Sequence, residues 1–195
     1  MGRVPLVNKN ELPDEYKILN EESGSLHEDM DAEWWQNQAT LRTYGNNVEL
    51  GKTHVATNVS LWTKNGLTPE ETEYVILSVA KSLRSKYIWH DHVIAAFERS
   101  NMTAKQLLAL AKDETNKLAD EHQSLISYTQ EFVEKDGDVS NKLYNELSNF
   151  YNNEQVVGIT MTAAYYMFIE FTARALQIPF NKDFIGWELE NYEEI

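Results

Sequence analysis

The chain has 195 residues, of which 42% are hydrophobic and 25% charged, a composition that excludes collagen-like and disordered proteins. It contains no cysteine, which excludes disulfides, thiolate metal sites and thiol nucleophiles. The formal net charge of −14 disfavours nucleic acid and anionic lipid as partners.

The N-terminal sequence has no apolar core of the kind found in secretory signals. We also find no stretch that approaches the roughly 20 apolar residues that a bilayer-spanning helix needs. The expected location is therefore the cytoplasm, with no membrane partner.

The first part of the chain alternates helix-breaking and helix-forming segments. Pro5 and Pro13 favour an extended arm over residues 1–13. Periodicity and turn residues then predict the following elements: a short helix over 14–20, a polar loop over 21–31, a helix over 32–44 that contains Trp34 and Trp35, and a helix over 48–64.

Clear helix starts mark the middle of the chain. Thr68-Pro69-Glu70-Glu71 combines an N-cap, a proline at the first helical position and a capping-box glutamate. Ser85 can cap the next helix, and Thr103 with Gln106 forms a second capping box. Further helices are expected around 122–134, after Ser140, and from 154 to about 177, where Pro179 follows.

A weak internal repeat is visible in two apolar helices that each begin with glutamate. EYVILSVAKSL, from Glu73, resembles EQVVGITMTAA, from Glu154, but only the first is followed by histidines. We therefore expect one domain with one site: an arm and loop over 1–31, a first repeat with the site over 32–135, a degenerate second repeat over 136–180, and an acidic surface tail over 181–195.

Two histidines lie close together in the segment SKYIWHDHVIAA. At about 100° per residue, His92 shares a helix face with Ile88 and Trp89, whereas His90 points the opposite way, towards solvent or another subunit. Histidines at positions i and i+2 diverge on a helix, so this spacing does not favour a metal site. No cofactor or metal is expected.

A buried His92 needs a polar partner, because an unsatisfied imidazole costs about 1–3 kcal/mol. Glu73 is the best candidate, since antiparallel packing of two short helices brings the start of the first near the later part of the second. A glutamate–histidine pair can transfer protons near neutral pH. The same pair can equally be a structural hydrogen bond in the core.

Four other residues are candidate substrate contacts. Ser85 and Tyr87 carry hydroxyl groups near the predicted pair, and Trp89 lies on the same face as His92. His54 lies on the preceding helix, where it could face a pocket. Each of these residues could instead serve only in packing or capping.

The segment LTPEETEYVILSVAKSLRSKYIWHDHVIAAFERSNMTAKQLLAL resembles the carboxymuconolactone decarboxylase family, which includes the alkylhydroperoxidase D-like proteins. Its features are a glutamate-bearing helix, a short turn, and a helix with the pattern aromatic–x–Trp–x–x–His. RVPLVNKNELPDEYK resembles the N-terminal arm of the family, and EQVVGITMTAAYYMFIEFTARALQIPF resembles its C-terminal helix.

The resemblance implies an all-α fold of helical hairpins that assembles into a homotrimer or hexamer with sites near subunit contacts. It gives Glu73 and His92 the role of proton-relay residues. The peroxidase branch has two cysteines where this chain has Ser85 and Ile88. Thiol-based peroxide reduction is therefore not available.

Together these observations predict a decarboxylase-like enzyme that acts on a small carboxylated or lactone-type substrate. His92 would transfer the proton and Glu73 would orient it. The alternative is a noncatalytic oligomer of the same fold, which binds a small molecule or serves a structural role.

Overall fold

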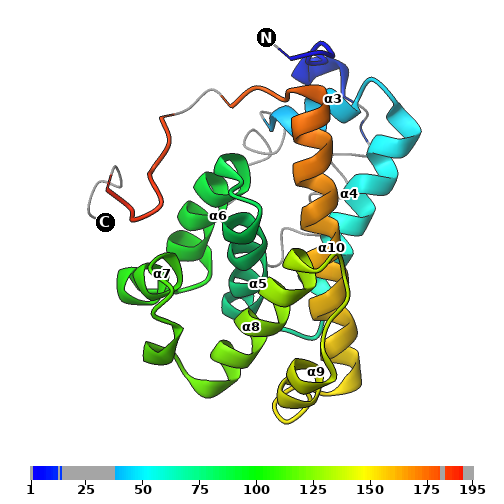
Figure 1. Cartoon of the computed structure of the whole chain (residues 1–195). Helices are drawn as coiled ribbons and strands as arrows, with labels where there is room; N and C mark the ends of the chain where they lie inside the picture. The colour runs from blue at the N-terminus through cyan, green and yellow to red at the C-terminus, as the bar shows by residue number, and fades with distance from the viewer. Residues whose placement is uncertain (1, 13, 15–37, 181–182, 191–195) are drawn as a thin grey trace. The chain divides into compact units, whose positions relative to one another are not determined.

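The computed structural model describes residues 2–12, 14, 38–180 and 183–190. Every regular element in these ranges is helical and none is a strand, which confirms the predicted all-α class (Figure 1). The elements are η1 (Lys9–Glu11), α3 (Ala39–Tyr44), α4 (Val48–Thr63), α5 (Pro69–Ser82), α6 (Lys86–Arg99), α7 (Ala104–Ala111), η3 (Thr115–Lys117), α8 (Asp120–Glu134), α9 (Asn141–Leu147) and α10 (Asn153–Leu176).

The chain divides into two compact units. The smaller unit comprises Met1–Lys64 and Phe171–Asn181, and the larger comprises Asn65–Glu170 and Lys182–Ile195. Each unit has its own buried apolar residues and is described by itself.

In the smaller unit, the N-terminal arm is held by hydrogen bonds at both ends. The Arg3 backbone N–H donates to the Leu176 carbonyl over 2.8 Å. The Arg42 side chain donates to the Val7 carbonyl over 2.8 Å, and the Val7 N–H donates to the Arg42 carbonyl over 3.0 Å. The arm is therefore extended as predicted, except for the turn η1. Its Leu12 joins an apolar cluster with Leu41, Val55 and Val59.

Helix α4 places His54 against the ring of Tyr44. The two ring centroids are 4.6 Å apart, in an edge-to-face arrangement. Burial penalises the charged imidazolium and lowers the pKa of His54 from 6.5 to about 4. His54 is therefore neutral at physiological pH.

The larger unit is organised around the hairpin of α5 and α6, which pack against each other. The Thr68 side chain accepts from the Glu71 N–H, and Glu71 accepts from the Thr68 N–H, so the predicted capping box is present. Ser85 caps α6 by accepting from the Ile88 N–H over 3.1 Å, also as predicted. These two caps fix where each helix of the hairpin begins.

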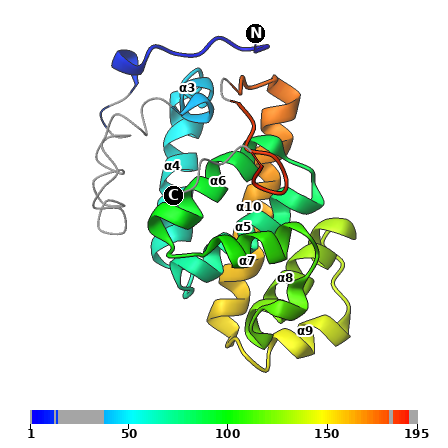
Figure 2. The ribbon, with the colours of Figure 1, turned by 90° about the vertical axis from the view of Figure 1, so that its left-hand side faces the viewer.

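Helices α8 and α10 complete the core of this unit. Helix α8 packs on α5 and α9 packs on α8 (Figure 2). A hydrogen bond of 2.7 Å between the Tyr128 and Thr160 hydroxyls joins α8 to α10. The largest fully buried apolar side chains of the unit are Trp89, Tyr74, Ile76, Leu77, Ile88, Leu107, Leu110, Leu125, Ile126, Leu147 and Ile159.

Gly158 allows α10 to approach the turn before α5 very closely. A Cβ atom at this position would lie 2.0 Å from the Asn65 carbonyl oxygen, so no larger residue fits without a backbone shift. The Asn65 side chain donates to the Thr72 hydroxyl over 2.9 Å and accepts from the Leu67 N–H over 2.9 Å. This contact therefore positions the first turn of α5, next to Glu73.

The sequence predicts no segment that could span a bilayer, but helix α10 meets the length and composition for one. By length and composition alone it could cross a bilayer, because it contains an 18-residue window with a mean hydropathy of 1.3. However, 56% of that window is buried inside the protein. Buried core helices of soluble proteins often have this length and hydropathy, so these two properties are weak evidence that α10 spans a membrane.

Some predictions fall outside the described residues. These are the helix over 14–20 beyond Asp14, the loop over 21–31, and the start of the helix over 32–44 with Trp34 and Trp35. The repeat boundaries likewise stay predictions.

We expect Gly158→Ala to destabilise the larger unit by about 2–3 kcal/mol, because the new methyl group forces α10 away from Asn65. Ala164→Gly, at an exposed position of the same helix, is the matched control and should cost only about 1 kcal/mol. Urea unfolding followed by circular dichroism measures both changes. Equal costs would contradict the close approach.

The low pKa of His54 predicts an acid sensitivity. The unfolded chain binds a proton at this residue below about pH 6.5, whereas the folded protein does so only below about pH 4. Stability should therefore fall as the pH is lowered through this window, by about 3 kcal/mol from this residue. His54→Phe keeps a ring against Tyr44 and should flatten that part of the pH–stability curve. An unchanged slope would show that His54 titrates normally in the folded protein.

Candidate active site

The predicted contact between Glu73 and His92 is present in the larger unit. His92 Nδ1 lies 2.9 Å from Glu73 Oε2. Glu73 is on the second turn of α5 and His92 on the second turn of α6, and the antiparallel hairpin brings them together. The expectation drawn from helix packing is thus confirmed for this contact.

The two partners differ in their access to solvent. The Glu73 side chain is fully buried, whereas 16% of the His92 side chain is exposed. The Tyr166 ring of α10 packs edge-on against the imidazole, with ring centroids 4.9 Å apart. His92 therefore links a buried carboxylate to a surface that a small molecule can touch.

The second carboxylate oxygen of Glu73 makes the buried side chain depend more strongly on its hydrogen bond with His92. Oε1 is buried and has no hydrogen-bond partner among the residues that the structure describes. A buried ionised carboxylate is costly unless it is paired, so His92 is the contact that makes Glu73 tolerable here. With Glu73 ionised, Nδ1–H donates to Oε2.

Ser85 lies in a second polar contact, between α6 and α10. It is fully buried, and its hydroxyl donates to Glu170 Oε2 while accepting from the Ile88 N–H. Ile88 is 2% exposed. The Ser85 hydroxyl therefore uses its donor and one acceptor position in hydrogen bonds within the protein.

The other predicted substrate contacts are distributed over several environments. Tyr87 is half-buried on the first turn of α6. Trp89 is fully buried and its indole N–H donates to the Gly186 carbonyl over 3.0 Å. His54 belongs to the smaller unit, against Tyr44. Their roles in binding substrate stay predictions.

The orientation predicted for His90 is wrong. His90 is only 6% exposed, and its Nδ1 accepts from the Ile185 backbone N–H over 3.2 Å. The periodicity of α6 indicates only the face that packs on α5. Residues 183–190 cover the opposite face, and Ile185, predicted in a surface tail, is 4% exposed.

Sequence reasoning missed two residues of α10, Tyr166 and Glu170. They are one turn apart on the helix, and each contacts a polar residue of α6, His92 and Ser85 respectively. A signal for Glu170 was present, because it is the one charged residue between Glu154 and Arg174 in an otherwise apolar helix. An isolated charge in such a run requires a buried partner.

No described part of the chain gathers three or more metal-binding side chains in a suitable cluster. A cavity of about 330 Å³ lies in the larger unit, but its lining includes neither Glu73 nor His92.

Comparison with known proteins supports the fold. No protein-family model matches the chain, and no match was found among curated proteins. A solved structure from Ralstonia eutropha JMP134, described as an uncharacterized peroxidase-related protein with an alkylhydroperoxidase AhpD core, aligns with a TM-score of 0.71. The alignment covers 96% of each chain at 15% sequence identity. The chain therefore has the alkylhydroperoxidase D-like helical fold.

Proposed function

We propose that this protein is an acid–base enzyme of the decarboxylase-like type, acting on a small carboxylated or lactone-type substrate without thiol chemistry. The observation that carries the proposal is the fully buried Glu73 carboxylate held 2.9 Å from a partly exposed His92. A carboxylate in this position fixes the tautomer and the orientation of the ring.

The proposed reaction needs one proton at one carbon. The bond between the substrate carbon and its carboxylate breaks, carbon dioxide leaves, and the electron pair remains as an enolate conjugated with the lactone or keto group. His92, protonated at Nε2, gives its proton to that carbon, and solvent then reprotonates the ring. Glu73 stays ionised and holds Nδ1–H throughout, so its burial prevents it from competing for the substrate.

The absence of cysteine argues against peroxide reduction through a thiol pair, although the fold also occurs in a peroxidase-related protein. Ser85 can form neither a sulfenic acid nor a disulfide. Its burial and its contact with Glu170 also support a structural role.

We also propose that the protein works as a cytoplasmic homotrimer or hexamer and that substrate reaches His92 near a subunit contact. The partial exposure of the imidazole in the single chain supports this arrangement, because a neighbouring copy can cover the open edge. No nucleic acid, membrane or cofactor takes part in the proposed reaction.

A noncatalytic role is favoured by one observation, the close packing of Tyr166 on the imidazole. Under this alternative, the Glu73–His92 contact only satisfies two polar groups in the core.

Turnover of carboxylated lactones and β-keto acids by His92→Gln tests the proposal. We expect kcat/KM to fall by about 100-fold to 10 000-fold, the usual contribution of a general acid or base, while the protein remains folded. The matched control is His122→Gln, because His122 is also 16% exposed and lies 3.9 Å from Glu70.

The His122 variant should turn over substrate at the parent rate. Turnover by the parent that is unaffected in His92→Gln would contradict the catalytic role of His92. Absence of turnover by the parent across the panel, with normal binding, would instead favour the noncatalytic alternative.

A further inference from the structure

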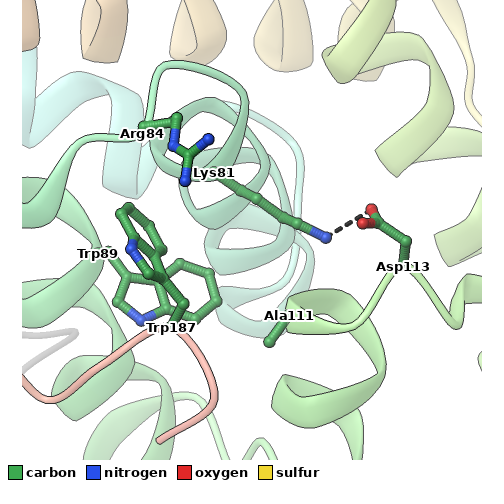
Figure 3. A pocket seen from close by; sticks show the side chains of 6 residues that line it. All are labelled: Lys81, Arg84, Trp89, Ala111, Asp113 and Trp187. Carbon is green, nitrogen blue, oxygen red and sulfur yellow. Dashed lines mark hydrogen bonds and ion pairs between the residues drawn. The ribbon is translucent and has the colours of Figure 1, made fainter.

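A cavity of about 330 Å³ lies at the C-terminal ends of α5 and α7, under the segment that follows α10 in sequence. Figure 3 shows its lining side chains around one common space. They are Lys81, Arg84, Trp89, Ala111, Asp113 and Trp187. This volume is within the range of small-molecule sites, at its lower end.

The charges of the lining favour an anion. Lys81 Nζ already donates to Asp113 over 2.5 Å and to the Leu110 carbonyl over 2.6 Å. The Arg84 guanidinium, in contrast, has no hydrogen-bond or ion-pair partner among the residues that the structure describes. The lining therefore has one uncompensated positive charge, in a chain whose net charge is −14.

The backbone at Arg84 adds an independent observation. Its φ is +53°, in the left-handed region where glycine is favoured. The Ser85 N–H donates to the Ala80 carbonyl over 2.7 Å and the Arg84 N–H to the Lys81 carbonyl over 2.9 Å, which makes a Schellman turn. Arginine is unfavourable at this position, and its side chain points to the cavity (Figure 3). A functional role for the guanidinium would explain why the strained backbone carries an arginine.

The indole of Trp187 forms the apolar wall of the cavity, and the fully buried indole of Trp89 packs against it. The centroids of Trp89 and Trp187 are 5.5 Å apart. The hydrogen bond from the Trp89 indole to the Gly186 carbonyl holds the neighbouring Trp187 in place. An aromatic wall beside a guanidinium suits a flat ring that carries a carboxylate, since arginine binds carboxylates in a bidentate manner. A cationic ligand would be repelled by Arg84 and Lys81.

The cavity is distinct from the candidate active site. Lys81 lies eight residues after Glu73 on α5, a separation of about 12 Å along the helix axis. We propose that this cavity is a second ligand site, which binds a small planar aromatic carboxylate through Arg84 and the indole of Trp187, which Trp89 supports. This inference does not depend on the proposed reaction.

Isothermal titration with benzoate, and with benzamide as the uncharged ligand of similar shape, tests the proposal on the full chain. Benzoate should bind saturably, and at least about tenfold more tightly than benzamide, because only benzoate has a charge for the guanidinium. Arg84→Gln should weaken benzoate binding by a similar factor. Lys105→Gln removes a charge from an exposed position of α7 outside the cavity, and should bind like the parent.

Two further variants separate binding from folding and from the other site. Arg84→Gly relieves the left-handed backbone, so its melting temperature should equal or exceed that of the parent while benzoate binding is lost. His92→Gln should leave benzoate binding unchanged. Absence of saturable binding, equal binding of benzamide, full binding by Arg84→Gln, or loss of binding in His92→Gln would each overturn the proposal.

Discussion

A carboxylate with no access to water must have a partner, and in this protein the partner of Glu73 is His92. This requirement constrains the start of α5, the turn between α5 and α6, and the contact with α10. Thr68 caps α5 at the point that lets Glu73 face α6, and the short α5–α6 turn lets His92 reach Oε2. The close approach of α10 at Gly158 then fixes the turn from which α5 starts.

The α5–α6 turn also separates two environments of different chemistry. Ser85 points into the contact between α6 and α10, where it pairs with the buried Glu170. Arg84, one residue earlier and in a left-handed conformation, points to the cavity beside Trp89 and Trp187. Adjacent residues of one tight turn thus serve different faces of α6.

The local parts of the structure could be predicted from the sequence because their causes are local. The capping residues Thr68, Ser85 and Thr103 each begin a helix where expected, and antiparallel packing predicted the Glu73–His92 contact. The burial of His90 could not be predicted in the same way. It depends on residues 183–190, about 95 positions away, which pack across α6 through a backbone hydrogen bond that leaves no pattern in the side chains. The cavity was missed for a similar reason, since Arg84, Asp113 and Trp187 meet only in the folded unit.

We propose that an ionised Glu73 accepts a hydrogen bond from the Nδ1–H of His92 and so fixes the tautomer of the ring. Long-range ¹H–¹⁵N correlation spectra of the imidazole, recorded across the pH range in which the protein is folded, measure this directly. We expect Nδ1 to carry a proton at every such pH, and we expect Glu73→Gln to perturb this nitrogen more than Glu70→Gln does. A neutral His92 with its proton on Nε2 and an unprotonated Nδ1 would contradict it, because Glu73 would then be the donor and the ring could not serve as proposed.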